Sequence, residues 1–293
     1  MSVELHCHTM FSVDAHGTPE AVVSRASDEG VHLMAVTDHN TIDGFERARK
    51  RASEVGIRLL TGVEIDARWR TSSHHFLGLG FDPLHQGLRT MLERNASWYG
   101  DSFEVMLDCF ADYGYTVDRG RLAAGLEERY PTHPSPRLNM WYARTVLLDD
   151  GVFPDRETYH AVVARIRDEH FARIPRGFGP LEETVDVVHD AGGLLLLAHV
   201  SQYRAADPKG QEALILEVLE AGVDGFELFH PDNMADPGFQ GLLALAESRG
   251  CLVSGGSDCH DVESDGKNAI GRAGVPDWVG DHLNERLVDP TGR

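Results

Sequence analysis

The sequence predicts an α/β protein in which a parallel sheet or barrel, covered by helices, is interrupted by a helical insertion. Short apolar runs alternate with stretches of helical periodicity at both ends of the 293-residue chain, which is typical of parallel sheets with helices outside. One pair of runs is joined by too few residues for a crossover helix. Between 84 and 180 the sequence indicates consecutive helices separated by proline and glycine clusters.

The first elements alternate regularly. Thr18 suits the N-cap of a helix and Pro19 its first turn, while Gly30 and Gly56 follow the ends of two helices. The expected elements are strands at 3–5, 33–36, 58–63 and 75–81, with helices at 19–29 and 42–55.

The connection between the runs 58–63 and 75–81 predicts an antiparallel hairpin. The segment 66–73 has eight residues, whereas a parallel connection needs roughly a dozen or more. In an antiparallel pair the second strand starts at the rim where the first one ends. We therefore expect His75 to lie beside Glu64.

The insertion is expected to contain helices at 87–113, 136–149 and 156–170, after which strand–helix alternation resumes. We assign 1–83 and 181–293 to the barrel and 84–180 to a helical cap, and expect little regular structure after Gly266. The later elements are helices at 181–191, 211–221 and 237–249 and strands at 194–198, 224–229 and 251–254.

The composition fits a soluble globular protein. A net charge of −20 argues against a nucleic-acid polymer as partner, because such partners need a basic surface. The longest apolar run, 194–198, is too short to span a membrane, and no signal peptide is recognisable. The four cysteines lack CxxC spacing, so we expect reduced thiols and a cytoplasmic protein. The sequence does not predict the oligomeric state.

Most of the expected strands end in residues that bind metals. Function in such sheets and barrels lies at the carboxyl ends of the strands, where these side chains would converge. His6 and His8 are two residues apart in or just after a strand, so both point to the same side. A divalent metal centre is therefore predicted at this rim. Besides Asp38, the candidates at this rim are the nine residues His6, His8, Asp14, His39, Glu64, His75, His199, Asp258 and His260.

Five ordered motifs along the chain resemble those of the PHP family, named for polymerase and histidinol phosphatase. The motifs are His6-Cys7-His8, Thr37-Asp38-His39, Gly62-Val63-Glu64-Ile65, Ala198-His199 and Gly256-Ser257-Asp258-Cys259-His260. The resemblance implies a distorted seven-stranded β/α barrel that binds two or three divalent ions, such as Mn, Zn or Fe, through the nine candidate ligands. It also implies that Asp38 orients a metal-binding histidine.

Within the family, the layout is most similar to bacterial phosphatases that act on nucleoside bisphosphates and other small phosphomonoesters. Those proteins also have a helical insertion, followed by a segment like Ala191-Gly192-Gly193. The chain departs from their pattern in the loop 12–15, in Asn139-Met140-Trp141 and at Val200, although Ala143-Arg144 matches. These departures bear on the substrate more than on the chemistry.

The resemblance implies metal-assisted hydrolysis of a phosphate ester by a hydroxide that bridges two ions, with Glu64 bridging the metals. Asp258 or His199 would transfer the proton, and the sequence does not decide between them. Two alternatives remain open. One is a metal-dependent amidohydrolase or esterase, and the other is a catalytically silent PHP module of the kind found in DNA polymerases.

The insertion is predicted to recognise a small phosphorylated substrate. Twelve arginines lie between 85 and 180, whereas the whole chain has three lysines. Guanidinium groups bind phosphate in a bidentate manner. The three candidates, each at or near a helix end, are Arg137, Arg144 and Arg176.

Overall fold

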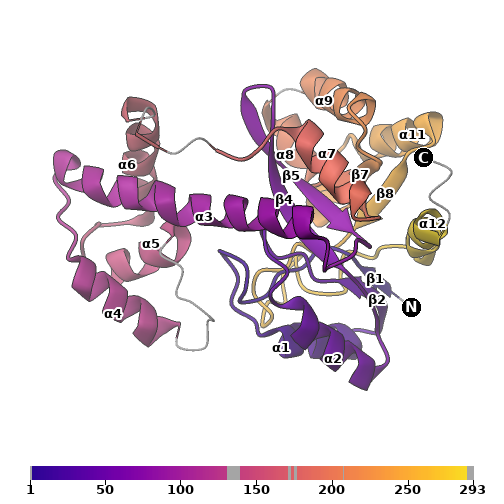
Figure 1. The fold of residues 1–293 in the computed structure, drawn as a ribbon, viewed down its shortest axis with the longest axis horizontal. Coiled ribbons are helices and arrows are strands. Elements are labelled where there is room, and N and C mark those ends of the chain that lie inside the picture. Colours follow the sequence, from indigo (N-terminus) through magenta and orange to yellow (C-terminus); the bar gives the residue numbers. More distant parts are fainter. Residues whose placement is uncertain (1, 131–138, 171–172, 175–176, 207, 289–293) are drawn as a thin grey trace. The chain divides into compact units, whose positions relative to one another are not determined.

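The computed structural model describes residues 2–130, 139–170, 173–174, 177–206 and 208–288. Residue contacts divide the chain into two compact units, one formed by 1–92 with 179–293 and the other by 93–178. All described strands belong to the first unit, and the described elements of the second unit are helices. The long helix α3 (Gln86–Cys109) starts in the first unit and ends in the second (Figure 1). The predicted roles of barrel and cap for these parts remain predictions.

The first sheet is parallel and has the order β1-β2-β3. Its strands are covered by two helices that pack against each other, α1 and α2, seen in indigo in Figure 1. The start of α1 is as predicted, because the Thr18 hydroxyl accepts a hydrogen bond from the Ala21 amide at 3.2 Å and Pro19 is the first helical residue. The elements are β1 (Ser2–Glu4), α1 (Pro19–Asp28), β2 (Val31–Ala35), α2 (Phe45–Val55) and β3 (Arg58–Leu60).

The second sheet has the order β4-β5-β6-β7-β8 and contains the expected hairpin. Strands β4 and β5 are antiparallel, with Asp66 opposite His75, and they turn at Arg70, whose φ of 55° is left-handed. Strand β5 is also antiparallel to β6, and the remaining pairs are parallel. The five strands are β4 (Gly62–Trp69), β5 (Ser72–Leu79), β6 (Leu194–Leu197), β7 (Gly225–Phe229) and β8 (Leu252–Gly255).

The predicted single strand at 58–63 is wrong in one respect. It is divided at Thr61 into β3, which pairs with β2, and β4, which pairs with β5. A continuous apolar run therefore serves two sheets, which periodicity alone does not reveal.

The described strands form a mixed α/β fold, and a closed seven-stranded barrel is not confirmed. Neither the three-stranded nor the five-stranded sheet is closed within the described residues. Isolated bridges do connect the two sheets, one between Cys7 and Cys259 and one between His39 and Glu64. These bridges bring the carboxyl end of β1 next to that of β8, and the segment after β2 next to β4.

Three of the remaining helices of the first unit follow the predicted alternation, and three others, at 200–206, 231–235 and 277–288, were not predicted. The chain after 266 was expected to lack regular structure, but it forms α12 (Asp277–Val288). Val279 and Leu283, one helical turn apart, are fully buried and anchor this helix on the core. The other helices are α7 (Leu181–Asp190), α8 (Val200–Ala206), α9 (Pro208–Glu220), α10 (Pro231–Ala235) and α11 (Phe239–Arg249).

The second unit has its own apolar core. Aromatic side chains at 103, 110, 153 and 159 are fully buried and pack edge to face. Within the described residues, every helix of the chain is too short or too polar to cross a bilayer. After α3 come a short 3₁₀ helix (Phe110–Tyr113), α4 (Arg119–Arg129), which was not predicted, α5 (Met140–Asp149) and α6 (Arg156–Glu169).

Candidate metal centre

The nine predicted ligands lie together. Seven of them follow the carboxyl ends of strands, whereas Glu64 lies near the amino end of β4 and His75 lies within β5. With Glu227 they form four overlapping groups, and within each group the donor atoms lie within 4.8 Å of one another. The groups are His8, Asp14, His39 and His260; His6, His8, Glu64 and Asp258; His39, Glu64 and His75; and His6, His199 and Glu227.

Glu64 is at the middle of this arrangement. Its side chain is fully buried in β4, and both carboxylate oxygens face imidazole nitrogens. His75, on the opposite strand of the hairpin, lies beside Glu64 as expected from the sequence. From Glu64 Oε2 the nearest nitrogens are His6 Nε2 at 3.1 Å, His8 Nε2 at 3.2 Å and His39 Nε2 at 3.4 Å; from Oε1 they are His75 Nδ1 at 2.9 Å and His199 Nε2 at 3.2 Å.

Asp258 is a second carboxylate with several imidazole neighbours. It follows β8 after the glycine pair 255–256, and a Cβ at Gly256 would lie only 2.3 Å from the His6 amide nitrogen, so the close approach requires glycine. Its neighbours are His6 Nε2 at 3.3 Å, His8 Nε2 at 3.2 Å and His260 Nδ1 at 3.5 Å from Oδ1, and His199 Nε2 at 3.6 Å and His230 Nε2 at 3.5 Å from Oδ2.

Backbone strain is concentrated at this rim. His199 and Asp258 have φ angles of 46° and 53°, which side chains with a Cβ adopt at a cost of about 1 kcal/mol or more. Each follows the end of a strand, β6 or β8. The strained turns direct both side chains toward Glu64 and His6.

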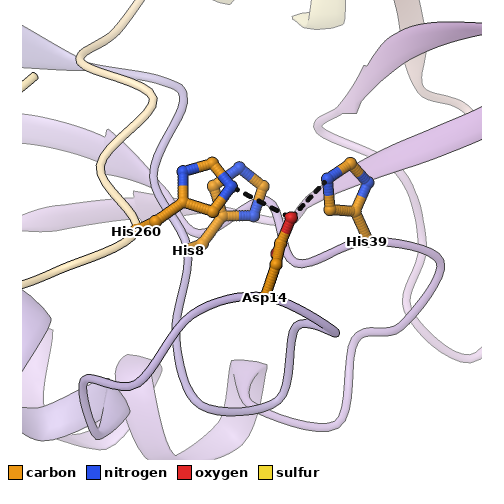
Figure 2. A group of neighbouring side chains, drawn as sticks. All are labelled: His8, Asp14, His39 and His260. Atoms are coloured by element: carbon orange, nitrogen blue, oxygen red, sulfur yellow. Dashed lines mark ion pairs between the residues drawn. The ribbon is translucent and has the colours of Figure 1, made fainter. Parts of the chain in front are cut away.

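Asp14 joins the centre from the loop after β1. Figure 2 shows its carboxylate between His260 and His39, with Oδ2 at 3.3 Å and 3.6 Å from the two Nε2 atoms. Ser12 Oγ donates to Asp14 Oδ1 at 2.9 Å, and the His8 ring stacks on His260 at 4.2 Å. The departure of this loop from the family pattern therefore leaves Asp14 within the group.

Charge is strongly coupled in the centre. Burial alone would raise the pKa of Glu64, but the surrounding histidines hold it well below its usual value. Burial opposes protonation of His8 too, yet hydrogen bonds that its ring donates to Asp258 and Glu64 raise its pKa to about 10. For His199 burial prevails and lowers the pKa to about 4. Neighbouring imidazoles thus differ in their affinity for a proton.

The donor set fits divalent metal ions. Three Nε2 atoms face one oxygen of Glu64, a convergence that a shared cation explains and neutral imidazoles do not. Among the described buried polar atoms, His199 Nδ1, His39 Nδ1 and His230 Nε2 have no hydrogen-bond partner. Mixed imidazole and carboxylate ligands suit Zn²⁺, Mn²⁺ and Fe²⁺. The residues can therefore hold divalent ions, in a number that the geometry leaves open.

Three participants were missed by the sequence analysis: Glu227, His230 and Asp66. Glu227 Oε1 lies 2.9 Å from His6 Nδ1, and its Oε2 accepts from the His199 amide at 2.9 Å. Asp66 Oδ1 lies 3.2 Å from His75 Nε2. A charged residue inside the apolar run of β7 was the available signal for Glu227, and the position after β7 was the signal for His230.

The predicted roles of Asp38 and of the arginines can be compared with their contacts. Asp38 accepts hydrogen bonds from the Thr9 amide and hydroxyl at 2.6 Å and 2.7 Å, not from a described histidine, and burial raises its pKa to about 6. Arg144 lies on α5 in the second unit. Arg137 and Arg176 lie outside the described residues.

Comparison with known proteins gives a consistent result. The model of the PHP domain matches residues 4–166. A 5'-3' exoribonuclease of Haemophilus influenzae is 29% identical over 88% of this chain and 89% of its own length. A 3',5'-nucleoside bisphosphate phosphatase of Chromobacterium violaceum is 27% identical over 91% of this chain and 90% of its own.

A solved structure from Bifidobacterium adolescentis, assigned as a metal-dependent phosphoesterase, resembles the whole chain. The TM-score is 0.76 at 26% identity, and the match covers 99% of this chain and 98% of that one. The similarity thus extends over the first and second units alike.

Proposed function

Because the chain belongs to the PHP domain family and is a metal-dependent phosphoesterase, we propose that it hydrolyses a small phosphomonoester, such as a nucleotide or a nucleoside 3',5'-bisphosphate. The observation that carries this proposal is the position of Glu64 among five imidazole nitrogens, next to a second carboxylate, Asp258. The similarity to a bisphosphate phosphatase over most of both chains supports the substrate class.

Two or three divalent ions would be held by the nine clustered residues, with Glu64 shared between ions. Bound ions of this kind lower the pKa of water toward neutrality and neutralise the charge of a phosphate group. His6, His8 and Asp258 would form one site, His75 and His199 a second, and Asp14, His39 and His260 a third.

The proton needed by the leaving oxygen would come from His199 or Asp258. His199 Nε2 and Asp258 Oδ2 lie 3.6 Å apart, so either atom would deliver a proton to a leaving oxygen from the same side of the metal centre. The side chain of His199 is 4% exposed and that of Asp258 is 15% exposed, so little solvent reaches the pair. Asn and Gln variants at these positions would show which residue carries the proton.

The test combines metal stoichiometry with phosphate release. The chain is stripped with a chelator, titrated with Mn²⁺, and assayed on a panel of nucleotides, bisphosphates and sugar phosphates and on a second panel of amides and carboxylic esters. We expect more than one equivalent of metal and phosphate release that depends on it. A single equivalent at saturation would contradict the multinuclear centre, and turnover restricted to amides or carboxylic esters would favour the amidohydrolase alternative.

RNA ends are a second candidate substrate. The observation that favours them is the 29% identity to a 5'-3' exoribonuclease across most of both chains. The net charge of −20 disfavours long polyanions but not a short phosphorylated end. A 5'-phosphorylated oligoribonucleotide in the same assay decides between them: shortening of the oligomer supports nuclease activity, and its persistence alongside nucleotide hydrolysis supports the phosphatase.

A further inference from the structure

Most described arginines of the second unit have a carboxylate partner. The nitrogen–oxygen distances in these ion pairs are at most 3.7 Å, and the pairs lie on the exposed surface of the helices. The pairs are Arg119 with Glu104 and Asp108, Arg121 with Asp150, Arg129 with Asp149, Arg165 with Glu169, and Arg173 with Asp108.

Arg144, Arg156 and Arg167 differ, because none of them forms an ion pair with a described carboxylate. The parts of the second unit outside the description, 131–138, 171–172 and 175–176, contain no aspartate or glutamate. An acid from those segments therefore cannot neutralise the three guanidinium groups. In a chain with 47 acidic residues and 27 basic ones, three neighbouring arginines without such a partner are unexpected.

The three arginines are brought together around His160. Positions 156, 160 and 167 lie on one stripe of α6, and α5 packs beside α6 and contributes Arg144. His160 Nε2 is 3.2 Å from Arg144 Nη1 and 3.4 Å from Arg156 Nε. We call Arg144, Arg156, Arg167 and His160 the arginine cluster.

The cluster has an excess of positive charge that the imidazole does not remove. Burial and the charge of Arg156 lower the pKa of the half-buried Arg144. Burial, followed by the charges of the three arginines, lowers the pKa of His160, so this ring is a neutral hydrogen-bond partner. Arg144 is partly buried, whereas Arg156 and Arg167 are exposed. A partly buried guanidinium group without a counter-charge is unfavourable, and an anion bound between it and the two exposed arginines would relieve this.

We propose that the arginine cluster is a binding site for a phosphate group. Guanidinium groups match the geometry of phosphate oxygens and form charge-assisted hydrogen bonds with them. Two sources share this chemistry: a phosphate group of the substrate, which rests on the proposed function, and free inorganic phosphate, the product of that reaction. The site itself uses residues of the second unit only.

Binding is measured on the full chain after metals are removed with a chelator. Inorganic phosphate, adenosine and adenosine 3',5'-bisphosphate are titrated into the wild type, into Arg144→Ala/Arg156→Ala, and into the matched control Arg121→Ala/Arg129→Ala, whose arginines have acid partners. We expect the first variant to bind phosphate and bisphosphate about tenfold or more weakly. The control and the adenosine titrations should not change. Equal affinities in the wild type and the Arg144→Ala/Arg156→Ala variant would overturn the proposal.

Kinetics on the metal-loaded chain identify the source of the phosphate. A raised KM for the bisphosphate with an unchanged kcat supports a substrate phosphate. An unchanged KM together with weaker product inhibition supports free phosphate. If the wild type hydrolyses none of the substrates, the proposed function is wrong. The binding titration still shows whether the arginine cluster binds phosphate.

Discussion

The two ends of the strand pair β6–β7 carry the same hydrogen-bond unit. At the carboxyl end, Glu227 accepts from the His199 amide at 2.9 Å and lies 2.9 Å from His6 Nδ1. At the amino end, Asp224 accepts from the Leu195 amide at 2.9 Å and lies 2.9 Å from His189 Nε2. Each carboxylate therefore ties one imidazole to one backbone amide of the neighbouring strand.

The difference lies in the other nitrogen of each imidazole. His6 is fully buried, and its Nε2 faces Glu64 and Asp258 at 3.1 Å and 3.3 Å. The side chain of His189 is 27% exposed, and its one ion pair among the described residues is with Asp224. The same unit thus stabilises the sheet at one end and, in addition, orients a candidate ligand at the other.

The largest effect is expected from Glu64→Gln, which changes the carboxylate that the carboxyl-end residues share. An amide has half the acceptor capacity and no negative charge, so metal binding should weaken by more than the 10–100-fold typical of outer partners. Phosphate release should be lost, while circular dichroism reports an intact fold. Metal content by elemental analysis accompanies the assay. Near-wild-type kcat with full metal content would show that Glu64 does not bridge ions.

The next effect is expected from Glu227→Gln, which changes the carboxylate that lies against His6 Nδ1. When His6 carries its proton on Nδ1, His6 and the His199 amide each donate to one oxygen of Glu227. A glutamine has one oxygen that accepts and one nitrogen that donates, so it can accept from only one of these two donors at a time in this geometry. The His6 ring then loses its partner or moves the proton to Nε2, the atom that faces Glu64. We expect metal affinity to fall about 10–100-fold.

The readout for Glu227→Gln is the titration of metal-free protein with Mn²⁺ or Zn²⁺. With Zn²⁺ or without metal, ¹⁵N NMR of the imidazole nitrogens also reports the tautomer of His6. Glu227→Asp, which keeps the charge but shortens the side chain, should recover part of the affinity. Unchanged affinity together with an unchanged His6 tautomer would reduce Glu227 to a structural residue like Asp224.

The sequence could place the nine candidate ligands near one another because most of them occupy a position with a local signature, and their binding of metal remains a prediction. Most of them follow a strand, and the hairpin rule brought His75 to Glu64. Glu227 and Asp66 lie inside strands, where a carboxylate is equally compatible with a solvated face, so the charged residue in the apolar run of β7 was only a weak signal. The Asp38 partner, Thr9, comes from another strand end, and only tertiary structure reveals it.

The fold was predictable where one apolar run belongs to one sheet. The run at 58–63 was misread because its two halves pair with different strands, and α12 was missed although Val279 and Leu283 have helical spacing. Likewise, twelve arginines between 85 and 180 were visible in the sequence, but their pairing was not. Whether an arginine has an acid partner depends on which helices pack together, so the cluster on α5 and α6 became visible only in three dimensions.

The smallest effect is expected from Asp224→Asn, the matched control at the amino end of β7. Its Oδ2 accepts from His189 and from the Leu195 amide, and an asparagine oxygen can replace one of these contacts well. Loss of one buried, charge-assisted hydrogen bond should cost about 1–2 kcal/mol, or a fall of a few degrees in Tm. Metal affinity and kcat should stay at wild-type values, because His189 faces no candidate ligand in the described structure. Thermal unfolding of metal-free protein and the same metal titration measure both quantities.

If Asp224→Asn weakened metal binding as much as Glu227→Gln, the effect of Glu227 would have to be assigned to general loosening of β6–β7 and not to the orientation of His6.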